Sequence, residues 1–289
     1  MLRRFTSLGR PLDWAYPSNR QIVLLSGGFL LAALAFQVLW LGRVDFWTAL
    51  WGAGWVFSTW ALGRELDPDQ PSNAFWAALA LGLGLLVRLS DWTLRGVLTG
   101  LLVSGVLMLA ARVTARTSGR RTTYPDQFVL AASPAVAAWF SGSPLWPLAL
   151  PVALALAFDA YGDKNRRHFV FGLILALVGG LLTWLLGGSR PPEVWSVGFT
   201  LALVVLGVVG LGFRAREPAL SAADDHQPLE PRRVTWARVV GIVGTLVGLA
   251  LIGFSPFLAV GWVGLFMLPR RSSGWNEGSG GPQPKDRAG

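Results

Sequence analysis

Apolar segments nearly long enough to span a bilayer recur along almost the whole chain, and they restrict the folds that it can adopt. There are ten, at 22–41, 46–62, 74–90, 97–112, 128–140, 147–160, 168–186, 194–213, 237–254 and 256–268. An apolar run of about 18–20 residues is long enough to cross a bilayer as a helix. Because backbone groups in lipid must be satisfied within the protein, each segment is predicted to be helical. The sequence therefore predicts an all-α fold, a polytopic transmembrane bundle of about nine or ten helices.

The composition agrees with a membrane protein. Hydrophobic residues make up 53% of the 289 residues and charged residues only 14%, against about 25% charged residues in a typical soluble domain. Many of the 15 tryptophans lie near segment ends, where the indole ring suits the membrane interface. The chain has no cysteine and only two histidines, His168 and His226. This excludes disulfides and thiol chemistry, and it argues against a multi-histidine metal centre.

The basic residues are distributed unevenly between alternate connectors. One set of connectors carries 21 of the 25 Lys and Arg residues: 1–21, 63–73, 112–127, 161–167, 214–238 and the tail from 269. The other set carries Arg43, Arg88, Arg95 and Arg190. The positive-inside rule then predicts that the first set and both termini are cytoplasmic, in a bacterial cytoplasmic membrane. The net charge of +9 fits membrane lipids as partners and requires no nucleic acid.

The chain divides into three parts by this scheme. Residues 1–21 are predicted to be a cytoplasmic N-terminal segment, 22–268 the transmembrane helical domain and 269–289 a cytoplasmic tail. The tail is rich in Gly, Ser and Pro, which predicts disorder. About twenty residues precede the first apolar run, so we expect that run to be a retained helix and not a cleaved signal peptide. Gly244 and Gly248, four residues apart, predict close helix packing.

Acidic residues gather in three connectors that the scheme places on one face of the membrane. The connectors read GRELDPDQPSN, ARTSGRRTTYPDQ and FDAYGDKNRRH, and their acids are Glu65, Asp67, Asp69, Asp126, Asp159 and Asp163. On a helix, Asp159 and Asp163 would lie one turn apart on the same face. Two such carboxylates repel each other unless a cation lies between them. Carboxylate oxygens together with substrate phosphates suit Mg²⁺.

Basic residues beside these acids could bind the same phosphates. Arg120, Arg121 and Lys164 are the candidates, with Arg166 and Arg167 following in the sequence. Carboxylates, Mg²⁺ and basic side chains together are what a diphosphate leaving group needs, because metal and cations stabilise the negative charge that develops. A plainer interpretation stays open for each motif. The connectors could be solvated, with Asp159 and Asp163 paired to neighbours such as Lys164 or Arg167, and Asp67-Pro68-Asp69 could be a simple turn.

These motifs resemble those of the UbiA-type intramembrane prenyltransferases. The family carries acidic motifs in the connectors after its second and sixth helices, and Asp159-Ala-Tyr-Gly-Asp163 matches the second motif, D-x-x-x-D with glycine before the final acid. Arg120-Arg121 stands where the family often has a Lys-Arg pair. Arg64 to Asp67 resembles the end of N-x-x-x-D-x-x-x-D. The first aspartate of that motif is replaced by Gly63 and the asparagine by Thr59.

The resemblance implies an Mg²⁺-dependent transfer of an isoprenoid group from a diphosphate donor to an apolar acceptor within the bilayer. Catalytic roles would then fall to Asp67, Asp159 and Asp163, which with Asp69 would hold the metal. The diphosphate would be bound by Arg120, Arg121 and Lys164. Two other functions remain open on the sequence. Ten helices also suit a small transporter of the drug/metabolite exporter type, and a non-catalytic accessory membrane subunit would explain the missing motif residues.

Overall fold

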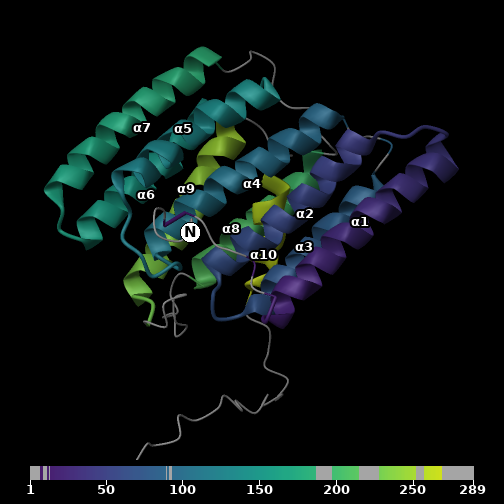
Figure 1. Ribbon diagram of the computed structural model, residues 1–289, viewed down its shortest axis with the longest axis horizontal. Helices are drawn as coiled ribbons and strands as arrows, with labels where there is room; N and C mark the ends of the chain where they lie inside the picture. Colours follow the sequence, from purple (N-terminus) through teal and green to yellow (C-terminus); the bar gives the residue numbers. More distant parts are fainter. Residues whose placement is uncertain are drawn as a thin grey trace, which may run out of the picture.

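A computed structural model shows that the chain folds into an all-helical bundle (Figure 1). The structure describes residues 7, 8, 12, 14–88, 90, 93–186, 197–214, 228–251 and 257–268. The ten helices are α1 (Pro17–Leu41), α2 (Phe46–Leu66), α3 (Pro71–Val87), α4 (Leu94–Ala115), α5 (Tyr124–Ser141), α6 (Ala149–Gly162), α7 (Arg166–Leu186), α8 (Val197–Arg214), α9 (Pro231–Leu251) and α10 (Leu258–Phe266). A 3₁₀ turn, η3 (Trp146–Leu148), leads into α6. In the described part of the chain, the predicted all-α fold is confirmed, and the ten helices agree with the predicted nine or ten.

Several helices begin earlier than the apolar pattern predicts, because local capping extends them into polar sequence. Helix α5 begins at Tyr124, where Thr123 and Asp126 form a capping box with reciprocal side chain to backbone hydrogen bonds. Helix α9 begins at Pro231 and not near 237, since proline is well suited to the first helical position. Helix α1 begins at Pro17, inside the predicted N-terminal segment. The predicted tail, 269–289, lies outside the described residues.

Helix α4 lies at the centre of the bundle. It packs against α2 on one side and against α5, α6 and α9 on the other. Helices α1 and α3 flank α2, while α7 packs on α5 and α6, and α10 packs between α8 and α3. In Figure 1, α1 and α7 therefore lie at opposite margins of the bundle. Both have apolar outer faces: Leu24 and Leu39 of α1 are 74% and 73% exposed, and Leu177 of α7 is 67% exposed.

Among the described residues, three helices are long and apolar enough to cross a membrane by length and composition: α1, α4 and α7. Helix α4 is largely buried inside the bundle, whereas α1 and α7 are largely uncovered. A soluble protein would rarely leave two such apolar helix faces open to water. The structure is thus compatible with a membrane protein.

Glycines permit the closest helix crossings. A Cβ on Gly248 would lie 1.9 Å from the ring of Phe257, and one on Gly244 would lie 2.9 Å from Leu107. The predicted close packing at these two glycines is confirmed. A second crossing was not predicted from the sequence. There α8 meets α10, and a Cβ on Gly210 would lie 1.7 Å from the carbonyl oxygen of Gly264.

Candidate functional site

Polar side chains gather at one end of the bundle, where α2, α4 and α6 finish and α1, α5, α7 and α9 begin. We call this the charged end. Long-range hydrogen bonds tie its segments together: Arg64 donates to Asn19 at 3.1 Å, and Arg112 donates to the carbonyl oxygen of Leu8 at 2.6 Å. Connectors that the basic-residue pattern assigned to one face therefore meet at one end of the fold.

Glu65 is one of the fully buried acids of the charged end. Its side chain is 1% exposed, near the C-terminus of α2. Arg112 of α4 donates to Oε1 from Nε at 2.8 Å and from Nη2 at 2.6 Å, and Thr117 donates to Oε2. Both oxygens are therefore hydrogen-bonded within the protein, and the pair locks the end of α2 to the end of α4.

Asp67, the C-cap residue of α2, is also 1% exposed. Asn73 donates to its Oδ2 at 3.0 Å, and Nη2 of Arg238 lies 3.8 Å from Oδ1. Arg238 also donates from Nε to the carbonyl oxygen of Leu66 at 2.8 Å. These contacts join the start of α9 to the end of α2. The other acid of this connector, Asp69, is partly exposed.

Asp159 and Asp163 share two arginines, as the D-x-x-x-D spacing on one helix face allows. Arg116 donates to Oδ1 of Asp159 from Nε at 3.0 Å and also bonds Asp163. Arg233 donates to Oδ1 of Asp159 from Nη1 at 3.1 Å and to Oδ1 of Asp163 from Nη2 at 3.1 Å. We call these four residues the Asp159 cluster. It joins the ends of α4 and α6 to the start of α9.

Two backbone features accommodate the Asp159 cluster. A Cβ at Gly162 would lie 2.2 Å from Nη2 of Arg233, so the glycine before the final acid makes room for that guanidinium. Arg116 has a φ of 56° at the C-cap of α4, a left-handed conformation that favours glycine. Arginine is less favourable than glycine in this backbone conformation, and the bonds of its side chain to the two carboxylates offset that cost.

The charges of the cluster stabilise one another. Burial would raise the pKa of Asp163, but the hydrogen bond and charge of Arg116, with the charges of Arg233 and Arg121, outweigh burial and hold that pKa below its ordinary value. Burial would lower the pKa of Arg116, and its contacts with Asp163 and Asp159 outweigh burial and raise it. Asp163 and Arg116 therefore both favour their charged forms.

The predicted phosphate-binding residues are not directly bonded to these acids in the described part of the chain. Arg120, Arg121 and Lys164 are exposed, and in the described part of the chain no hydrogen bond or ion pair links them to Asp159 or Asp163. The alternative expectation, that these two aspartates pair with their sequence neighbours in water, is wrong for Asp159. Asp159 is 2% exposed, and its partners come from two other helices.

Sequence reasoning missed the four arginines that hold the acids: Arg112, Arg116, Arg233 and Arg238. Their signal was present, because each stands at or near a helix end beside apolar residues. The positive-inside interpretation explained them equally well and left no reason to separate buried arginines from solvated ones. Asp126 was missed as a structural residue too. It caps α5, and its Oδ2 accepts a bond from the Ser7 hydroxyl at 2.9 Å.

The acids of the charged end do not fit the predicted Mg²⁺ site in this arrangement. Among the described residues, no three His, Asp or Glu side chains form a group that could hold a metal ion. The carboxylates of Asp159 and Asp163 face guanidinium groups, which occupy the positions that a metal would need. This arrangement does not favour Mg²⁺ binding by Asp67, Asp69, Asp159 and Asp163, which stays a prediction.

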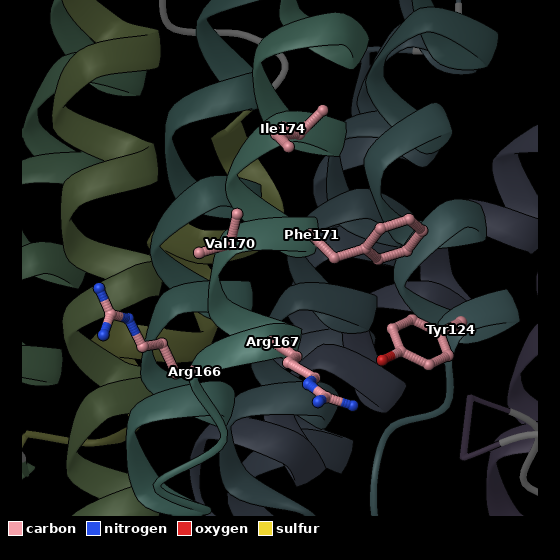
Figure 2. A pocket seen from close by; sticks show the side chains of 6 residues that line it. All are labelled: Tyr124, Arg166, Arg167, Val170, Phe171 and Ile174. Carbon is pink, nitrogen blue, oxygen red and sulfur yellow. The ribbon is translucent and has the colours of Figure 1, made fainter.

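Two grooves flank the first turn of α7 at the charged end. One, of about 820 Å³, is lined by Tyr124, Arg166, Arg167, Val170, Phe171 and Ile174 (Figure 2). The other, of about 610 Å³, lies between the ends of α6, α7 and α9 and is bordered by Lys164, Arg166 and Arg232. In Figure 2, Arg166 and Arg167 point to opposite sides of α7. Both grooves combine basic side chains with apolar or aromatic walls.

Comparison of the chain with protein families, with curated proteins and with solved structures gives no match. The resemblance to UbiA-type prenyltransferases therefore stays a prediction that rests on a few motif positions.

Proposed function

We propose that the chain is a non-catalytic, multi-pass accessory subunit of the bacterial cytoplasmic membrane, whose acidic motifs are structural. The observation that carries this proposal is the occupancy of Asp159 and Asp163 by Arg116 and Arg233. A carboxylate that binds Mg²⁺ must offer its oxygen lone pairs to the metal. Here those lone pairs accept hydrogen bonds from arginines instead.

Energetics favour a structural role for these acids. Separating one partner from a buried ion pair costs about 3–5 kcal/mol, because the remaining charge is left uncompensated. Asp159 is 2% exposed and has two arginine partners, so a metal ion would have to displace both guanidinium groups. Glu65 and Asp67 are equally buried. Paired acids of this kind fix which helix ends meet, and they hold the bundle in one arrangement.

The proposed topology places the charged end in the cytoplasm, as the distribution of Lys and Arg predicts. It can be tested with single cysteines, since the chain has none. Arg120 and Arg43 are exposed and lie at opposite ends of the bundle. In spheroplasts, a membrane-impermeant thiol reagent should label Arg43→Cys strongly and Arg120→Cys only after the membrane is permeabilised. Labelling of Arg120→Cys in intact spheroplasts would overturn the topology, and recovery of the chain in the soluble fraction would overturn the membrane location.

A second candidate function is the prenyltransferase activity with Mg²⁺, an isoprenoid diphosphate and an apolar acceptor. One observation favours it: Asp159 and Asp163 lie one turn apart at the same end of the bundle as the exposed bases Arg120, Arg121 and Lys164. In this candidate, binding of the diphosphate would draw Arg116 and Arg233 away from the carboxylates. The exporter-type transporter gains no comparable support and stays a prediction.

Thermal unfolding of the purified protein decides between the two candidates. For a structural cluster, an isoprenoid diphosphate should shift the midpoint equally with Mg²⁺ and with a chelator. Asp163→Asn should lower the midpoint in both conditions, because the side chain of Asp163 bonds two arginines. A stabilising shift that needs Mg²⁺ and disappears in Asp163→Asn would instead support the enzyme. Asp69→Asn is a control for the loss of stability alone, because Asp69 lies outside the Asp159 cluster but is itself one of the predicted metal ligands.

A further inference from the structure

Three cations from different parts of the chain border one groove at the charged end. Lys164 stands in the turn after α6, Arg166 is the first residue of α7, and Arg232 is the second residue of α9. All three line the groove of about 610 Å³ and are exposed. Their convergence depends on the fold, because Arg232 lies far from the other two in the sequence.

The groove keeps a positive charge. In the described part of the chain, Lys164, Arg166 and Arg232 have no ion-pair partner. The acid that lines the groove, Glu230, accepts a hydrogen bond from Nε of Arg233 at 3.2 Å. These three cations therefore differ from the arginines of the Asp159 cluster, whose charges are balanced by buried carboxylates. Their arrangement suits an anion supplied by a ligand.

The backbone of Lys164 is a second indication that this residue binds a ligand and does not only stabilise the fold. Its φ is 53°, and Arg116 is the other non-glycine residue with positive φ among the residues described. A lysine in this conformation is strained relative to glycine. For Arg116, the two carboxylates that it bonds explain why the side chain is kept. Lys164 has no such partner in the described residues, and its ammonium group borders the groove.

Aromatic side chains form the wall of the groove beside these cations. Trp236 of α9 stacks on Phe158 at a ring-centroid distance of 5.3 Å and meets Tyr161 edge-on at 5.8 Å. Phe169 of α7 lines the same groove and is 40% exposed. The uncovered apolar face of α7 continues away from the charged end through residues such as Leu173. A ligand that fits would thus carry an anionic group at one end and hydrocarbon at the other.

We propose that this groove binds an anionic membrane phospholipid. Its phosphate would lie between Lys164, Arg166 and Arg232, where a guanidinium can offer two parallel hydrogen bonds to phosphate oxygens. An acyl chain would run past Trp236 and along α7. The proposal rests on the membrane location given under Proposed function, but it does not depend on whether the Asp159 cluster is catalytic.

The test compares lipids retained by the full chain in detergent, measured by native mass spectrometry. Phosphatidylglycerol should be retained in preference to phosphatidylcholine. From the contribution of one basic residue near a membrane surface, Lys164→Gly should weaken phosphatidylglycerol binding about fivefold, and Lys164→Gln/Arg166→Gln/Arg232→Gln on the order of a hundredfold. Arg120→Gln/Arg121→Gln removes two exposed charges from the same end without touching the groove, and it should retain the lipid.

Four results would overturn the proposal. Equal weakening in Arg120→Gln/Arg121→Gln would mean diffuse attraction to a basic surface. Displacement of phosphatidylglycerol by millimolar inorganic phosphate would identify a free-phosphate site, and tighter binding of an isoprenoid diphosphate would identify a different ligand. Thermal unfolding of each variant shows whether it is folded. A chain that sediments with membranes yet shows no preference for phosphatidylglycerol would contradict this inference alone and leave the proposed location intact.

Discussion

Glu65→Leu should lower the free energy of unfolding by about 3–5 kcal/mol, because it removes one partner of a buried ion pair. Arg112 is 8% exposed, and its Nε and Nη2 groups would lose the oxygen to which both donate. Leucine cannot accept a hydrogen bond, so the guanidinium charge would be left without its carboxylate in the bundle. Chemical unfolding of the purified protein in detergent measures the loss.

The double variant Glu65→Leu/Arg112→Met should recover most of that loss. Replacing both members of a buried ion pair by apolar residues of similar size is often neutral or stabilising. Arg112 also donates to the carbonyl oxygen of Leu8, so recovery should be incomplete. Glu65→Leu/Arg120→Met is the control, because Arg120 is exposed and not bonded to Glu65. If both double variants were equally unstable, the pairing of Glu65 with Arg112 would not be the cause.

The helical fold could be predicted from the apolar runs in the sequence. Each helix core is an apolar run, and the bilayer requirement that backbone groups be satisfied turns such runs into helices. Boundaries were harder to predict, because they depend on capping. Thr123 and Asp126 extend α5 through two reciprocal hydrogen bonds, and Pro231 starts α9 in sequence that has the composition of a loop. Apolar periodicity cannot reveal either extension.

The acids of the candidate site could be predicted from the sequence, but their partners could not. Acids in an apolar chain are conspicuous. The four buried acids of the charged end (Glu65, Asp67, Asp126 and Asp159) and the half-buried Asp163 all lie in connectors that the sequence singled out. Their partners were not predictable, since the bond between Asp159 and Arg233 spans 74 residues. Nothing in sequence spacing distinguishes Arg233, which is buried, from its exposed neighbour Arg232. The positive-inside rule predicts both, and only the packing of α9 against α6 separates them.

This separation gives the basic residues of the charged end two roles. One group neutralises buried acids and sets which helix ends meet, as Arg233 does for Asp159. The other group, which includes Lys164 and Arg232, borders a groove without acidic partners among the described residues. The two roles predict different effects of substitution on the stability of the bundle. Removing a neutralising arginine should destabilise the bundle, whereas removing a groove cation should leave its stability intact.

The two effects on stability can be compared by substituting glycine for Arg116 and for Lys164. Both have left-handed backbones, with φ of 56° and 53°, and glycine should relieve about 1–2 kcal/mol of strain at each position. The greater freedom of glycine in the unfolded chain cancels about 0.4–1 kcal/mol of that gain. Lys164→Gly should therefore be neutral or stabilising by up to about 1.6 kcal/mol, because Lys164 has no ion pair in the described residues.

Arg116→Gly should instead destabilise the protein by about 1.4–5 kcal/mol. The same backbone relief applies, but Asp159 is 2% exposed and would lose a charged donor, at a cost of about 3–5 kcal/mol. Asp163 would lose the side chain that holds its pKa down. Chemical unfolding of the two glycine variants in parallel gives the change in the free energy of unfolding for each. Because the backbone effect is common to both, the difference between these changes measures how much more the Arg116 side chain contributes to stability than the Lys164 side chain. Equal stabilities for the two variants would mean that Arg116 contributes no more to the bundle than an unpaired surface lysine, and the structural role of the Asp159 cluster would fall with it.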